Sequence, residues 1–329
     1  MITHIKRFDY IDIVKGIGII LVICSHSMYS DLMSVASSCF IPLFYVASGY
    51  VTSKVDLKRK AKRLLIPYIF FNAVILVLMW ITGLRDITLV QFEGILYSRY
   101  SLYRLDTVDN CVFMNIGNSP LWFLTSMFLA FVWFYLLLQI KRNGTRLVLL
   151  LTYLIITIFF SYLPILLPWS LDTSFLMAIF IYSGYAVRHK EYGIDLLSGK
   201  AVYGLSILYF LCLMINGYTN LSVSNFGKSV WLTGLAGIAG SLVLIKCAMW
   251  LEKTKCRNAL MKIGKNSLII FCIQMPLLFV ADKFYYYIVG GELGKCELIM
   301  GALFQVLFSI IIGYWVSKVL MKTIPWVFN

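Results

Sequence analysis

Long apolar runs recur along the whole chain, and they constrain its fold more than any other feature. Each run suits a helix of about 20 residues, the length that crosses a bilayer. Because the runs are continuous and do not alternate at a period of two, helices are favoured over a β-barrel. We therefore predict an all-α polytopic integral membrane protein with a single domain over residues 1–329. The predicted spans lie near 12–30, 34–53, 64–83, 120–140, 146–165, 173–188, 201–218, 229–250, 266–282 and 297–317.

The distribution of charge predicts the orientation of these ten spans. The chain has 329 residues, of which only 13% are charged, and a net charge of +14. Of its 29 Lys and Arg residues, 21 fall in segments on one side of the predicted membrane, six fall on the other, and Lys15 and Lys246 lie inside spans. Basic residues gather in cytoplasmic loops, so both termini are predicted to be cytoplasmic. Because topology explains the basic character, no nucleic-acid partner is expected.

Two ionisable residues interrupt the first span. Lys15 and His26 are eleven residues apart, so they share one helix face and lie about 16 Å apart along the axis. Asp12 precedes Lys15 by three residues, which favours an ion pair with Lys15 over one with His26. Ionisable groups inside a span are functional candidates by default. Lys15 can also snorkel to the headgroups, and His26 can also be a hydrogen-bonded packing residue.

Five short motifs follow one another in a fixed order between residues 7 and 280. They read "DIVKGIGIILVICSH", "FIPLFYVASGYV", "KRKAKRLLIPY", "SPLWFLTSMFLAF" and "IGKNSLIIFCIQMP". Together they resemble the motifs of the acyltransferase-3 family, membrane proteins that O-acylate bacterial surface polysaccharides and related sugars and include fucose O-acetylase-like proteins. The matching residues are Asp12, Lys15, His26, Pro42, Phe44, Ser48, Gly49, Tyr50, Lys60, Arg63, Pro67, Trp122, Phe123, Leu124, Asn266 and Ser267.

Two positions depart from the family pattern. Lys60 stands where the family's basic element has an arginine, which keeps the charge but removes bidentate phosphate binding. Gln274 stands where many relatives have a second histidine. A mechanism that requires two histidines is therefore not expected in this chain.

The resemblance implies an enzyme that moves an acyl group from cytoplasmic acyl-CoA, most simply acetyl-CoA, to a hydroxyl of a surface polysaccharide or lipid-linked glycan. Acyl-CoA is then a substrate, and neither a bound cofactor nor a metal is implied. Lys15, Lys60 and Arg63 would bind the CoA phosphates as charge-assisted donors. The basic stretch from Lys54 to Arg63 can also be a topology marker or a contact for anionic lipids.

The remaining candidates have paired interpretations. His26 would act as general base on the acceptor hydroxyl or would carry the acyl group as a transient acyl-histidine. Tyr50 and Trp122 would wall the sugar or thioester pocket, or would pack in the core. Asn266 and Ser267 would donate to the carbonyl oxygen or cap the ninth span.

Two features leave the function open from sequence alone. The loop over residues 84–119 is expected outside the membrane, as a solvated linker or as part of a sugar-contacting cap. Ten helices with intramembrane polar groups also suit a transporter or flippase for a sugar-lipid or anionic metabolite, although no internal repeat is apparent. A purely structural membrane protein would leave Lys15 and His26 unexplained. The enzyme reading places the chain in the bacterial cytoplasmic membrane.

Overall fold

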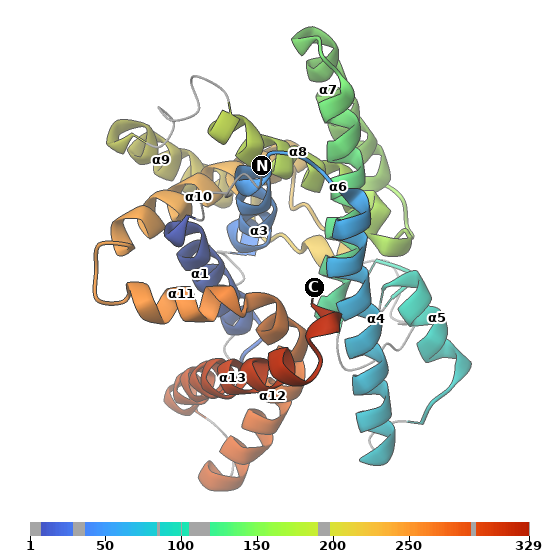
Figure 1. Cartoon of the computed structure of the whole chain (residues 1–329), viewed down its shortest axis with the longest axis vertical. Helices are drawn as coiled ribbons and strands as arrows, with labels where there is room; N and C mark the ends of the chain where they lie inside the picture. The colour runs from blue at the N-terminus through green and yellow to red at the C-terminus, as the bar shows by residue number, and fades with distance from the viewer. Residues whose placement is uncertain are drawn as a thin grey trace.

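The structure, a computed structural model, describes residues 8–28, 37–83, 86–99, 101–104, 119–189, 198–290 and 294–328. Within these ranges the regular structure is helical, apart from two isolated β-bridges (Figure 1). The all-α prediction is confirmed. The α-helices are α1 (Asp9–Ser25), α3 (Ser37–Val51), α4 (Leu57–Ile81), α5 (Leu89–Tyr97), α6 (Trp122–Gln139), α7 (Asn143–Ser161), α8 (Leu171–His189), α9 (Gly199–Asn216), α10 (Val230–Leu251), α11 (Arg257–Lys265), α12 (Ser267–Val289) and α13 (Lys295–Thr323).

Eight of the described helices are long and apolar enough to cross a membrane: α4, α6, α7, α8, α9, α10, α12 and α13. The chain is therefore a multi-pass membrane protein. Every predicted span coincides with a helix, but α1 and α3 have only 17 and 15 residues in the described part of the chain. The prediction of ten full-length spans is thus confirmed for eight helices.

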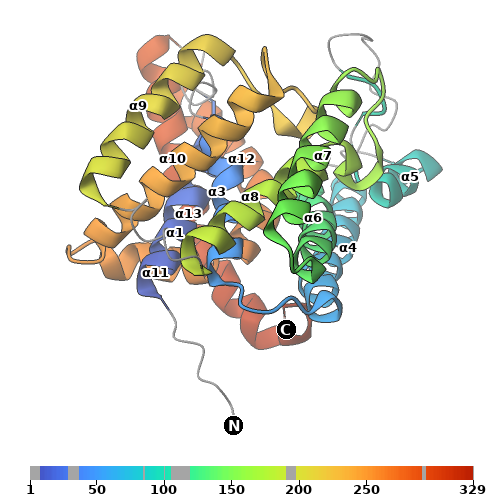
Figure 2. The same ribbon diagram turned by 90° about the horizontal axis from the view of Figure 1, so that it is seen from above.

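The two short helices lie in the middle of the molecule. Figures 1 and 2 show α1 and α3 between α9 and α10 on one side and α4 to α7 on the other. In α1 the side chains of Ile13, Val14, Ile19 and Ile23 are completely buried. Because neighbouring helices shield α1 and α3 from lipid, their length need not match the hydrocarbon thickness.

The outer helices present apolar side chains outwards. In the apolar stretches of α7 and α9 only 17% of the residues are buried, whereas 72% are buried in the apolar stretch of the inner helix α8. On α7 the exposed side chains include Leu147, Ile155 and Phe159. Large exposed apolar residues on a long helix are typical of contact with lipid.

Helices α3 and α8 cross through glycines. A Cβ at Gly49 would overlap the carbonyl of Ile181, and a Cβ at Gly184 would overlap the carbonyl of Val46. Helices in a membrane approach closely where small residues meet. The glycine after Ser48 in the second motif therefore holds α3 against α8.

Several predicted boundaries of spans differ from the helix ends in the structure, and local capping explains one of them. Helix α4 begins at Leu57, not near residue 64, because the Asp56 side chain accepts from the backbone N–H of Arg59 at 3.0 Å. Most of the basic stretch is therefore helical. Helix α1 ends at Ser25, not near residue 30, so His26 is its C-cap.

The predicted outer loop contains structure that the sequence did not indicate. Residues 86–104 include α5 and the buried Arg99, whose guanidinium forms an ion pair with Asp172 at the start of α8. Arg99 also donates to the carbonyls of Leu167 and Ser222, and the Ser224 hydroxyl donates to Asp172 at 2.7 Å. This pair joins three segments distant in sequence. Residues 105–118 of the predicted loop lie outside the described residues.

Candidate functional site

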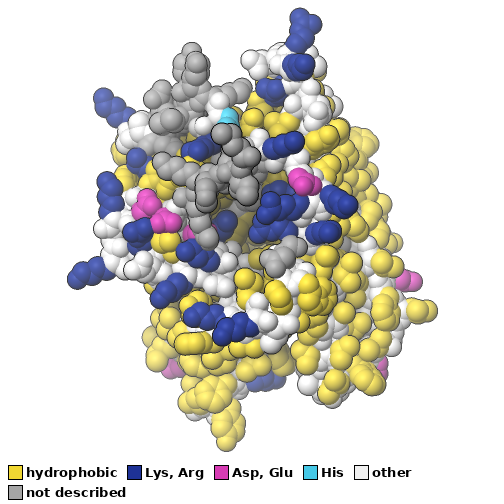
Figure 3. Space-filling model, in the orientation of Figure 1, with side chains coloured by type: hydrophobic (Ala, Val, Ile, Leu, Met, Phe, Trp, Pro, Cys, Tyr) yellow, Lys and Arg dark blue, Asp and Glu magenta, His cyan; other side chains and the backbone are white. Residues whose placement is uncertain are grey.

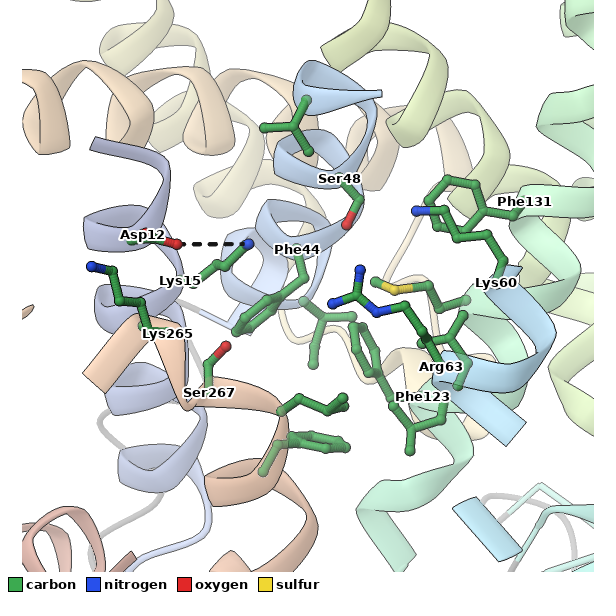
Figure 4. A pocket seen from close by; sticks show the side chains of 18 residues that line it. Asp12, Lys15, Phe44, Ser48, Lys60, Arg63, Phe123, Phe131, Lys265 and Ser267 are labelled. Atoms are coloured by element: carbon green, nitrogen blue, oxygen red, sulfur yellow. Dashed lines mark ion pairs between the residues drawn. The ribbon is translucent and has the colours of Figure 1, made fainter. Parts of the chain in front are cut away.

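A cavity of about 330 Å³ lies between α1, α3, α4, α6, α11 and α12. The sequence predicts a role in the site for nine residues: Asp12, Lys15, His26, Tyr50, Lys60, Arg63, Trp122, Asn266 and Ser267. Five of them line the cavity, namely Asp12, Lys15, Lys60, Arg63 and Ser267. Figure 4 shows Lys15 on α1 and Arg63 on α4 extending towards each other from opposite walls. Lys15 is therefore brought into one cavity with Lys60 and Arg63, which follow it by 45 or more residues in the sequence.

The α1 wall carries an ion pair. The Lys15 ammonium lies 4.0 Å from the carboxylate of Asp12, as the three-residue spacing predicts. The Asp12 side chain is 7% exposed and that of Lys15 is 35% exposed, so the lysine is the member of the pair that faces open space. The ion pair is thus oriented with its cation towards the open part of the cavity.

The α4 wall carries two cationic side chains. Lys60 and Arg63 are three residues apart, so they share a face of α4. The Lys60 ammonium lies 3.6 Å from the centre of the Phe131 ring, a cation–π contact. In the part of the chain that the structure describes, no carboxylate lies within ion-pair distance of either residue. Together with Lys15 on the opposite wall they make the cavity attractive to anions, on a face over which Lys and Arg side chains are numerous (Figure 3).

A close backbone contact places the third wall. A Cβ at Gly264 would overlap the carbonyl of Asp12, so only glycine lets α11 approach α1 so closely. This contact brings Ser267 to the cavity, where its hydroxyl points inwards (Figure 4). Lys265 also lines the cavity, but its amine is directed away from Arg63.

Sequence reasoning missed the apolar part of the lining. Phe44, Phe123 and Phe131 line the cavity beside the cations. The ring of Phe123 contacts those of Phe44 and Phe271 with centroid distances of 5.7 and 5.3 Å. All three residues belong to the quoted motifs, yet an aromatic residue in an apolar span carries no signal that separates lining from core.

His26 lies further along α1 and does not line this cavity. Its Nδ1 is 2.8 Å from the carbonyl oxygen of Val22, which fits the tautomer with the proton on Nδ1. Nε2 then keeps its lone pair. The His26 side chain is accessible to solvent, although many protein atoms lie around it. The structure therefore holds the ring by one nitrogen and leaves the other available.

The turn after His26 is fastened to α12 and α13. The backbone N–H of Met28 donates to Oε1 of Gln305 at 2.7 Å, and Nε2 of Gln305 donates to the carboxylate of Asp282 at 3.0 Å. Gln305 is almost completely buried. These two hydrogen bonds place the His26 turn at the level of Asp282 on α12.

The three remaining candidates do not line the described cavity. Tyr50 is buried and accepts a hydrogen bond from the Tyr10 hydroxyl at 2.9 Å. Trp122 is buried at the start of α6, 6.0 Å from the Arg99 guanidinium. The Asn266 amide donates to the carbonyl of Lys262 at 2.8 Å, so it caps the last turn of α11.

The model of the Acyl_transf_3 family, described as an acyltransferase domain, matches residues 8–322, which include every candidate residue. No curated protein and no solved structure matches the chain. The match covers nearly the whole chain, from the first residue of the described structure to the last helix. The chain therefore belongs to the Acyl_transf_3 family and is a membrane enzyme that transfers acyl groups.

Proposed function

We propose that this enzyme is an O-acetyltransferase of the bacterial cytoplasmic membrane. Its donor is cytoplasmic acetyl-CoA, and its acceptor is a sugar hydroxyl of a surface polysaccharide or lipid-linked glycan. A single domain over residues 1–329 carries the activity. The sequence resemblance supports the donor and the acceptor class, and the family match supports acyl transfer.

The observation that carries the proposal is the cavity beside the inner part of α1, which cationic residues of α1 and α4 line. Lys15, Lys60 and Arg63 line one space together with the hydroxyl of Ser267. CoA is anionic through its phosphates, and cations beside aromatic rings suit a nucleotide of this kind. The side with most Lys and Arg is the expected cytoplasmic side, where acyl-CoA is found.

The second part of the proposal is the geometry of α1. His26 lies eleven residues beyond Lys15, about 16 Å along the helix axis. Phosphates held at Lys15, Lys60 and Arg63 would let the extended pantetheine arm carry the thioester along α1 towards the ring. Nε2 of His26 would then face the reacting groups.

The chemistry balances when one proton is transferred twice. The acceptor oxygen attacks the thioester carbonyl, a C–O bond forms, and the C–S bond breaks. Nε2 of His26 takes the hydroxyl proton and returns it to the departing CoA thiolate. In the alternative route Nε2 attacks the thioester carbonyl first, the C–S bond breaks, and the CoA thiolate leaves with the Nδ1 proton. The acceptor hydroxyl then attacks the acyl-imidazole, the N–acyl bond breaks, and the imidazole takes up the hydroxyl proton.

The test uses the full chain purified in detergent, with acetyl-CoA labelled in the acetyl group and a glycan acceptor. The wild type should label the acceptor, and His26→Ala should lower the rate at least about 100-fold, within the contribution of general acid–base catalysis. CoA affinity should be unchanged because His26 does not line the cation cavity.

His189→Ala is the matched control, since His189 is exposed on α8 and hydrogen-bonded to the Thr52 carbonyl. It should label the acceptor at the wild-type rate. Acceptor labelling by a folded His26→Ala variant at the wild-type rate would refute the role of this histidine. Protein-bound label after omission of the acceptor would favour the acyl-histidine route.

A further inference from the structure

Gln274 on α12 is an exception among the buried polar side chains. It is 0% exposed, and within the described residues neither Oε1 nor Nε2 has a hydrogen-bond partner. Buried amides are almost always satisfied, because an unmatched donor or acceptor costs free energy. An amide with both ends unmatched is therefore a candidate for binding a ligand.

The depth of Gln274 is bracketed by contacts at both ends of α12. Seven residues before it, Ser267 lines the cation cavity. Eight residues after it, Asp282 is joined through Gln305 to the turn that carries His26. At 1.5 Å per residue, Gln274 lies about 10 Å from the first level and about 12 Å from the second.

The face of Gln274 is the one that continues the cavity wall. Positions 267, 271, 274 and 278 follow the spacing of one helix stripe. Ser267 and Phe271 line the cavity, and Leu278 is buried further along the stripe. Gln274 therefore occupies the inward side of α12, between the cation cavity and the His26 turn.

The chemistry of an unmatched carboxamide specifies its ligand. The group offers N–H donors and one carbonyl acceptor, which is the complement of a secondary amide. The pantetheine arm of CoA contains two secondary amides between its phosphates and its sulfur. We propose that Gln274 binds an amide of the pantetheine arm and guides it from the cation cavity to His26. This inference rests on the proposed acyl-CoA donor.

The experiment compares two probes on the full chain in detergent by calorimetry. Coenzyme A contains the pantetheine arm, whereas adenosine 3′,5′-bisphosphate carries phosphates without it. Gln274→Met keeps the length of the side chain and removes the amide. It should weaken coenzyme A binding about tenfold, the effect of one or two lost hydrogen bonds, and leave bisphosphate binding unchanged.

A matched control separates binding from structure. Gln305→Met makes the same substitution at a buried glutamine whose partners are the Met28 N–H and Asp282. It should lower the melting temperature, whereas Gln274→Met should keep or raise it because an unmatched polar group is removed. Gln274→Leu is a second variant in case the methionine packs poorly.

Three results would overturn the inference. The first is coenzyme A affinity in both Gln274 variants equal to that of the wild type, and the second is an equal loss for both probes. A lower melting temperature in both variants would be the third, since it would indicate a structural partner. A wild-type protein that binds neither probe would instead overturn the proposed donor, and the role of Gln274 with it.

Discussion

Removal of the Arg63 charge tests the cation cavity most directly. Arg63→Gln keeps a polar side chain on α4 and removes one of the four cations that line the cavity. A hydrogen bond to a charged group contributes about 1.5–3 kcal/mol. Because Arg63 is exposed, solvent screening places its effect at the lower end of this range, and about 1.5 kcal/mol corresponds to roughly a tenfold loss of coenzyme A affinity.

The neighbouring residue supplies the control. Lys62 is exposed on the same turn of α4 and does not line the cavity. Lys62→Gln changes the net charge by the same amount as Arg63→Gln, so any effect of overall charge appears in both variants. We expect the affinity of Lys62→Gln to stay within about twofold of the wild type, because a distant exposed charge is largely screened.

The assay is calorimetric titration of the detergent-solubilised full chain with coenzyme A at an ionic strength of about 0.15 M, where the Debye length is about 8 Å, with melting temperatures measured in parallel. Arg63→Gln should keep the wild-type melting temperature, since within the described chain its guanidinium makes no ion pair. Equal losses of affinity in Arg63→Gln and Lys62→Gln would refute local phosphate binding at this wall. So would an Arg63→Gln variant that binds coenzyme A as tightly as the wild type.

Three further results are expected. Asp172→Ala leaves the buried Arg99 without its carboxylate and should lower the free energy of unfolding by about 3–5 kcal/mol, measured by thermal denaturation. Gly264→Ala places a Cβ against a carbonyl of α1 and should lower both stability and coenzyme A affinity, whereas Gly204→Ala, with open space around it, should alter neither. Ionic strength of about 1 M shortens the Debye length to about 3 Å and should weaken coenzyme A binding more in the wild type than in Arg63→Gln.

Each of these has an outcome that contradicts it. An Asp172→Ala protein as stable as the wild type would show that the Arg99 guanidinium is solvated or finds another partner. Wild-type coenzyme A affinity in Gly264→Ala would show that the α1–α11 contact does not shape the cavity. Salt-independent binding would remove the electrostatic account of the cation wall.

Local features of the sequence were enough for the fold class and for part of the site. A bilayer demands apolar runs with internally satisfied backbones, so continuous runs predict helices wherever they occur. The i,i+3 spacing of Asp12 and Lys15 predicted their ion pair, and both members lie within one helix. Lys60 and Arg63 were likewise visible as cations on one face of a single segment.

Other features depended on which segments meet. The sequence of α1 looks like any other apolar run, but its central position, shielded by other helices, comes from packing against distant elements. In the sequence, Arg99 looks like a charged residue of a solvated loop. Its burial is explained by the ion pair with Asp172, which is 73 residues away. Tyr50 and Trp122 are aromatic residues of the kind that can line a pocket, but both are buried in the core.

Hydrophobic length and charge are properties of single segments, so the many membrane crossings of this chain and the expected side of its cations follow from the sequence alone. That Lys15, Arg63 and Ser267 share a cavity, and that Gln274 is buried with no partner among the described residues, is evident only from the packed structure. Both facts depend on distances between helices. Those distances are set by close contacts such as Gly264 on Asp12, which no single segment contains.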